Sequence, residues 1–408
     1  MATIATRPSQ PAERATISNP WVRRTALMAS FLLSGGLLLF PRLPLLGFLV
    51  VLCFVDRGGR LTINPRMTGA WVWLAAVALL TLVRPGGVDV AASATRFANF
   101  AGAMALLRMY LEAPRDALAA DLRAVLPWLS IQAVLTVVFG LFFSILAFPL
   151  NIDGATYTTF MLLFTWHETI ATSSLLVRPD GFFFEPGVFQ IFLNIHLFVS
   201  LFPRRDWRQA ALATAAVLAT QSTTGLIIAL AQFAVVTWPV LSRGDALQRS
   251  FKFISMAIIV VPLVIATATN VEEKFFGASR GSAWARQYDL LTGINIVSAY
   301  PLTGIGFDHA RYTALAGQFG FSDTDLSPDS LDDRTSSNGL IQVLYSVGLL
   351  FAAPWLIGLF RNSTLRPAWL FGILLILALN GEALAFTPFF AMFALGGMMR
   401  RPLATQST

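Results

Sequence analysis

Twelve long apolar runs dominate the sequence and restrict what it can fold into. A helix needs about 20 apolar residues to cross the hydrocarbon core of a bilayer, and many of these runs approach that length. We therefore predict an all-α polytopic membrane protein with about 12 transmembrane helices. The predicted spans are 22–40, 43–55, 69–84, 92–110, 124–148, 187–202, 209–221, 224–241, 252–269, 338–360, 368–380 and 383–399.

The composition agrees with this fold class. Charged residues make up only 12% of the chain, whereas about 25% of the residues in soluble domains are charged. In a soluble chain the net charge of +7 would indicate a nucleic acid partner. Here the basic bias of short cytoplasmic loops explains the charge, and we expect no nucleic acid partner. The single Cys53 excludes an intramolecular disulfide.

The basic residues also predict the topology. With a cytoplasmic N-terminus and twelve alternating spans, the cytoplasmic segments collect 20 of the 29 Lys and Arg residues. Both termini are then cytoplasmic, and loops 149–186 and 270–337 lie on the extracytoplasmic side. We expect residues 1–20 to be a disordered tail, 402–408 to be a second tail, and 21–401 to form a single transmembrane domain.

The loop 270–337 is much longer than an ordinary connection between helices, so it is the expected site of action. Residues Gly281–Ser298 can form a helix within it, with aromatic and apolar side chains on related turns. Pro301 and the glycines that follow it end this helix. The shorter stretch Arg178–Gly187 is the expected partner of this loop.

The stretch Arg178–Gly187 combines a cation, carboxylates and three phenylalanines at the start of a predicted span. Pro186 suits the first turn of a helix, and Glu185 would lie at its positive end. A helix cap with an aromatic anchor is therefore one interpretation. This interpretation does not explain Arg178. The second interpretation is that the stretch is a functional site.

Arg280 and Arg286 lie on the side of the membrane that lacks the basic bias. Planar guanidinium groups bind phosphate in a bidentate way and stay charged at any working pH. Together with Arg178 they could neutralise a diphosphate. The alternative is pairing with carboxylates of the same loop, namely Asp323, Asp325, Asp329, Asp332 and Asp333.

Four further features carry weaker signals. Gly304 and Gly306 permit a close backbone approach, although two glycines alone are a weak phosphate-loop pattern. His309 lies in a polar loop, and no spacing of histidines fits a metal site. Glu382 interrupts the last apolar run and is a functional candidate because ionisable residues in membranes are costly. Arg96 is another ionisable residue within a predicted span. Its long side chain could extend to the membrane interface, in which case it would need no functional role.

Three of these segments, in this order, resemble motifs of the O-antigen ligase and O-antigen polymerase superfamily of bacterial envelope glycan assembly. They are Gly181–Gly187, which has the pattern G-x-x-x-E-P, Arg280–Arg286 and Pro301–Phe307. The break Gln221–Gly225 resembles the Ser/Thr-x-Gly element that interrupts a span in this family. The resemblance covers most of the chain and implies a GT-C-type glycosyltransferase fold.

The resemblance also implies a reaction. A glycan carried on undecaprenyl diphosphate is transferred to an acceptor at the bacterial inner membrane, with inversion and without metal, nucleotide sugar or cofactor. Arg178, Arg280 and Arg286 would hold the diphosphate, and Glu185 would be the catalytic base, with His309 as the other candidate. The residues expected in the substrate cavity are Tyr288, Gly304, Gly306, Asn338 and Glu382.

One departure from the family pattern narrows the reaction. Many ligases have His-Asn where this chain has Ser337-Asn338, which favours a polymerase of O-antigen, capsule or exopolysaccharide over a ligase. Its expected partners are lipid-linked donor and acceptor oligosaccharides, the lipid bilayer and a chain-length regulator. A transporter is the third alternative, because its helices are often broken by polar residues, as at Asn380-Gly381-Glu382.

Overall fold

A computed structural model describes most of the chain. The described residues are 19–36, 41–56, 64–84, 87–152, 155–167, 177–202, 205–241, 280–319, 336–362 and 364–399, with single positions between 248 and 272. Nearly all of the predicted tail 1–20 and all of 402–408 fall outside these ranges. So do most of the predicted span 252–269 and the aspartates proposed as partners for Arg280 and Arg286.

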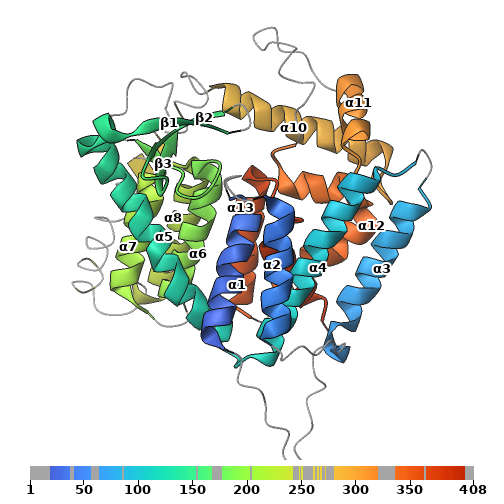
Figure 1. The fold of residues 1–408 in the computed structure, drawn as a ribbon, viewed down its shortest axis with the longest axis horizontal. Helices are drawn as coiled ribbons and strands as arrows, with labels where there is room; N and C mark the ends of the chain where they lie inside the picture. The colour runs from blue at the N-terminus through green and yellow to red at the C-terminus, as the bar shows by residue number, and fades with distance from the viewer. Residues whose placement is uncertain are drawn as a thin grey trace, which may run out of the picture.

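The described part is a bundle of α-helices (Figure 1). Every predicted span except 252–269 overlaps one of these helices, although the predicted span 124–148 runs past the end of α5 to the first residue of β1. They are α1 (Pro20–Leu33), α2 (Arg42–Val55), α3 (Thr68–Leu82), α4 (Val90–Glu112), α5 (Ala117–Phe142), α6 (Pro186–Leu201), α7 (Trp207–Ala219), α8 (Thr223–Leu241), α10 (Arg280–Ala299), α11 (His309–Phe319), α12 (Gly339–Arg361), α13 (Ala368–Gly381) and α14 (Pro388–Gly397).

Four apolar segments among the described residues are long enough to cross a membrane: Pro65–Leu82, Val90–Glu112, Ala117–Phe142 and Gly339–Arg361. Shorter apolar helices, including α2, α6 and α13, pack beside them. The length and composition of these helices thus support the prediction of a mostly helical membrane protein.

Helices α6 and α14 form the centre of the bundle. Every residue of α6 from Val188 to Leu201 and all ten residues of α14 are buried. Helices that are apolar all round are expected in such a position. Phe192 of α6 stacks on Phe183 with ring centroids 4.7 Å apart and also contacts Phe389 of α14. This aromatic core fixes the segment Gly181–Gly187 against both central helices.

A small antiparallel sheet, which the sequence analysis did not predict, lies at one end of the bundle. Its strands β1 (Phe148–Ile152), β2 (Ala155–Phe160), β3 (Phe164–His167) and β4 (Arg178–Pro179) are arranged in the order β1-β2-β3-β4. The prediction that the fold is all-α is therefore wrong for this region. Thr and aromatic residues, which fit a half-buried pleated surface, dominate β2 and β3.

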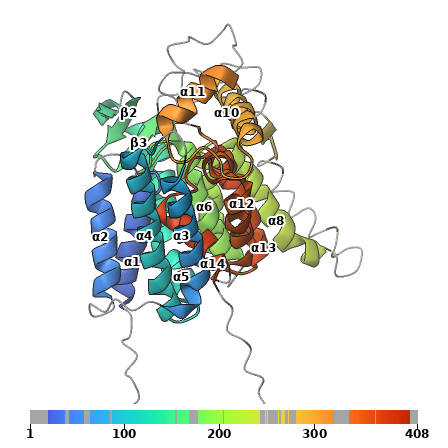
Figure 2. The same ribbon diagram turned by 90° about the vertical axis from the view of Figure 1, so that its right-hand side faces the viewer.

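The same end of the bundle carries α10 and α11, which lie across the tops of the other helices (Figures 1 and 2). The prediction of a helix over Gly281–Ser298 is confirmed by α10. Helix α10 packs against both α11 and α12. The polar loop and the sheet thus form one cap over the bundle.

The Pro301–Phe307 motif joins α10 to α11 and docks on a break in α12. Gly348 interrupts α12 with φ of 71° and ψ of 169°. The backbone N–H groups of Ile305 and Gly306 donate to the carbonyl oxygens of Tyr345 and Ser346 over 2.7 and 2.9 Å. A Cβ atom on Gly304 would collide with the backbone of α12 at this contact. The first glycine of the motif therefore serves backbone packing.

Candidate functional site

Glu185 occupies the N-cap position of α6, but its side chain makes no capping hydrogen bond. Its backbone carbonyl oxygen instead accepts from the N–H groups of Val188 and Phe189, each over 3.2 Å. The interpretation of this side chain as a helix cap is therefore wrong. The carboxylate of Glu185 does not cap α6, so it can serve another task.

Glu382 and Arg286 lie next to Glu185, although they are far from it in the sequence. Arg286 Nη2 lies 4.0 Å from Glu382 Oε1, and Glu382 is only 4% exposed. A Cβ atom on Gly187 would lie 3.7 Å from Glu185 Cδ and in collision with Glu382 Oε1. Two carboxylates and one guanidinium therefore meet around Gly187. We call Glu185, Arg286 and Glu382 the carboxylate cluster.

The structure places the other two predicted diphosphate ligands on β4 and at the start of α10. Arg178 is in β4, and its Nε donates to the carbonyl oxygen of Thr220 over 3.3 Å, at the break between α7 and α8. Arg280 is the first residue of α10, and its side chain lies outside the described part of the structure. Arg286 follows Arg280 on the same helix.

Two predicted cavity residues have structural partners. Tyr288 is buried, stacks on Trp284, and donates from its hydroxyl to the carbonyl oxygen of Ala316 over 3.3 Å, which ties α10 to α11. Asn338 accepts from the N–H groups of Leu340 and Ile341 and so caps α12. Its Nδ2 donates to Asn380 Oδ1 over 2.9 Å, just before Glu382. This bond holds the end of α13 against the start of α12.

A cavity of about 570 Å³ lies beside the carboxylate cluster. Of the predicted residues, Gly306 and His309 line it, while Tyr288, Gly304, Asn338 and Glu382 do not. Phe184 and Ala383, the neighbours of Glu185 and Glu382 in the chain, also form part of its wall. The cavity and the cluster therefore share two backbone segments.

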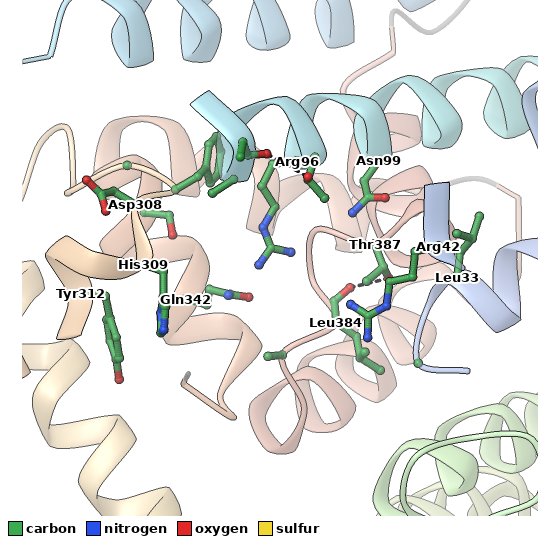
Figure 3. A pocket seen from close by; sticks show the side chains of 18 of the residues that line it. Leu33, Arg42, Arg96, Asn99, Asp308, His309, Tyr312, Gln342, Leu384 and Thr387 are labelled. Carbon is green, nitrogen blue, oxygen red and sulfur yellow. Dashed lines mark hydrogen bonds between the residues drawn. The ribbon is translucent and has the colours of Figure 1, made fainter. Parts of the chain in front are cut away.

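Figure 3 shows that the side chains of Arg42, Arg96 and His309 approach this cavity from α2, α4 and α11. Asn99 and Gln342 add amide groups to its wall. The arrangement offers cations and hydrogen-bonding groups together with apolar surface. Such a combination suits a ligand that has anionic, sugar and lipid parts.

Sequence reasoning missed two features of this region. The first is Arg42, because nothing in the sequence places the start of α2 beside α4. Asp289 is fully buried, and its Oδ2 accepts from Ser337 N over 2.8 Å and from Ser337 Oγ over 2.5 Å. Its spacing of three residues from Arg286 places both on one face of α10, which was an available signal.

In the part of the chain that the structure describes, no group of three or more His, Cys, Asp or Glu residues could hold a metal ion.

Comparison with known proteins gives one result. Residues 115–288 match the family model of the WcaD colanic acid polymerase, over less than half of the chain. No curated protein and no solved structure matches. The matched segment runs from the start of α5 into α10 and contains Glu185, Arg178 and Arg286.

The family match and the apolar helices agree that this is a membrane protein. The resemblance that the motifs predict is confirmed: over residues 115–288 the chain is similar to the colanic acid polymerase family, which is of the O-antigen polymerase type.

Proposed function

We propose that this protein is an inner-membrane polysaccharide polymerase. It transfers a growing glycan from undecaprenyl diphosphate to a sugar hydroxyl of an incoming lipid-linked repeat unit. The observation that carries the proposal is the carboxylate cluster, in which Glu185 and Glu382 meet Arg286 beside a cavity lined by cations. The family match supports the polymerase class.

In the proposed reaction the bond between the anomeric carbon and the diphosphate oxygen breaks, and its electron pair leaves with the diphosphate. The acceptor hydroxyl oxygen forms the new glycosidic bond from the opposite face, which inverts the anomeric carbon. Its proton passes to Glu185. Arg178, Arg280 and Arg286 stabilise the negative charge of the departing diphosphate, a role that fixed guanidinium groups perform well.

Glu185 is favoured over His309 as the base for two geometric reasons. Its side chain makes no capping bond at α6, and it lies beside the second carboxylate of the cluster. Glu382 is nearly fully buried and is 4.0 Å from Arg286, so we assign it to orienting that guanidinium. His309 is exposed on the far wall of the cavity, where we assign it to binding sugar.

The topology of the proposal follows from the distribution of basic residues. The end of the bundle that carries the sheet, α10 and α11 faces the periplasm, and both termini are cytoplasmic. Twelve spans arranged as in the GT-C class surround the site. The polyprenyl tails lie in the bilayer, the sugars lie beneath α10 and α11, and no metal or other cofactor takes part.

The arginines provide the first test of the diphosphate site. Arg178→Ala and Arg286→Ala variants are expected to insert stably and to leave the lipid-linked repeat unit unpolymerised. Arg115, which is exposed and does not line the cavity, provides the matched control Arg115→Ala. Full-length polymer from both site variants would show that the diphosphate site is wrong. Accumulation of long undecaprenyl-linked chains would indicate a ligase instead.

A further inference from the structure

Arg42 and Arg96 lie on two neighbouring helices and line one wall of the 570 Å³ cavity. Figure 3 shows both side chains directed toward this space, with Thr387 and Leu384 between them. Neither arginine is among the proposed ligands of the donor diphosphate. The cavity therefore contains a second group of cations that the proposed reaction has not yet used.

Both arginines lie where a cation costs stability. Arg42 is the first residue of α2, at the helix end where the macrodipole is positive and disfavours cations. Arg96 lies in the first half of α4, one of the segments apolar enough to cross a membrane. Ionisable residues inside membrane helices are expensive and are therefore candidates for function. Helix stability thus explains neither residue.

The protein itself supplies little negative charge to these cations. Among the described residues, no carboxylate oxygen lies within the 4.0 Å ion-pair distance of Arg42 or Arg96. Asp308 is part of the cavity wall, but its Oδ1 accepts from the backbone N–H of Arg311 at the start of α11. Arg84 adds another cation beside the cavity. Its Nη2 donates to the carbonyl oxygen of Thr303, and its guanidinium lies against Gly306, which lines the cavity. The wall therefore has an excess of positive charge.

The remaining wall residues indicate what kind of anion fits. Leu33, Leu43 and Leu46 provide apolar surface, and Leu43 is 67% exposed, so the cavity reaches the molecular surface along α2. Asn99 and Gln342 can hydrogen-bond to hydroxyl groups. An anion with a lipid tail on one side and sugar on the other would use all of these surfaces.

We propose that Arg42 and Arg96 bind the diphosphate of a second polyprenyl-linked glycan, the acceptor, while the carboxylate cluster holds the donor. This inference rests on the proposed function, because only a polymerase of this kind requires two lipid diphosphates at once. Phe184 lines the acceptor cavity, and the next residue is the proposed base Glu185. This places the proposed base one residue from the cavity wall, and in the proposal the acceptor sugar approaches it from that side.

The first test counts bound lipids on the purified full-length protein, with undecaprenyl diphosphate as the probe and native mass spectrometry as the measurement. The wild type is expected to bind two molecules, and the Arg42→Gln/Arg96→Gln variant one. Arg115→Gln is the matched control and should still bind two. Because glutamine removes charges from costly positions, the variant should fold at least as well as the wild type. Arg42→Gln alone, at the exposed start of α2, provides a second variant if the double variant is unstable.

The second test separates charge recognition from chemistry. With a lipid-linked acceptor, each substitution should raise KM by roughly 10- to 100-fold, the range for hydrogen bonds to charged groups. With a short acceptor glycan that lacks diphosphate, wild type and variant should react at equal rates. Equal losses on both acceptors would overturn the inference, because Arg42 and Arg96 would then support the fold or the chemistry.

The outcomes of the binding experiment are distinct. One bound lipid in the wild type, unchanged in the variant, would overturn the acceptor site and leave the donor site standing. One bound lipid that is lost in the variant would place the donor at Arg42 and Arg96 and also overturn the two-site arrangement. No binding to the wild type would overturn the proposed function along with the inference.

Discussion

Gly187→Ala tests the carboxylate cluster without removing any charged or polar group. Gly187 lies in the first turn of α6, where its Cα faces Glu382 and Glu185. A Cβ atom added there would overlap Glu382 Oε1 and lie 3.3 Å from Glu382 Cδ. To restore ordinary contact, the carboxylate has to move by roughly 1 Å. The ion-pair contact of 4.0 Å with Arg286 would change with it.

The expected result is a loss of activity without a loss of stability. A displacement of about 1 Å at a reacting centre can reduce the rate roughly 100-fold. The fold should instead gain up to about 1 kcal/mol, since alanine is a better helix former than glycine. The assay is the initial rate of polymer formation in proteoliposomes, together with the thermal unfolding temperature of the same preparation.

Gly47→Ala provides the matched control. Gly47 also lies in a helix, and a Cβ atom there would meet nothing within 4 Å, so its variant should keep the wild-type rate. A Gly187→Ala variant with a normal rate would refute the reasoning, because the positions of Glu382 and Arg286 could not then matter to catalysis. A large fall in unfolding temperature would equally show that Gly187 serves packing.

Three further predictions concern other parts of the chain. Glu185→Gln is expected to abolish polymer formation while leaving lipid binding unchanged; activity that survives would make His309 the base. Gly304→Ala should lower the unfolding temperature, because its φ of 63° and the backbone of α12 both oppose a side chain. In the control Gly317→Ala, within α11, the added Cβ meets nothing within 4 Å, so the unfolding temperature should not fall. Asp121→Asn should destabilise the fold by about 3–5 kcal/mol. In the wild type the buried Arg23 Nε lies 2.8 Å from the Asp121 carboxylate, and the variant removes that negative charge. An unchanged unfolding temperature would contradict this prediction.

The helices could be predicted because the information for them is local. Each apolar run carries its own signal, and the observed helices overlap the predicted spans, although the predicted bounds of α1 and α5 are several residues off. The sheet was missed because its strands are short, and their alternation of Thr and aromatic residues fits an interfacial loop as well. The role of Gly304 was also hidden, since it depends on the break that Gly348 makes in α12.

The candidate site could be predicted only in part. The G-x-x-x-E-P motif located Glu185, and the costly position of Glu382 singled it out. Their meeting with Arg286, however, depends on packing between α6, α10 and the loop after α13, which no local pattern encodes. Arg42 was missed for the same reason, because only the packing of α2 against α4 makes it part of the cavity.

The central claim is that this protein joins lipid-linked glycans to one another. The most direct measurement supplies the purified protein, in proteoliposomes, with a single undecaprenyl-diphosphate-linked repeat unit. We expect a ladder of longer lipid-linked glycans and the release of one undecaprenyl diphosphate for each unit added. Uptake of the substrate with no new glycosidic bond, or transfer only to an acceptor without lipid diphosphate, would contradict the account.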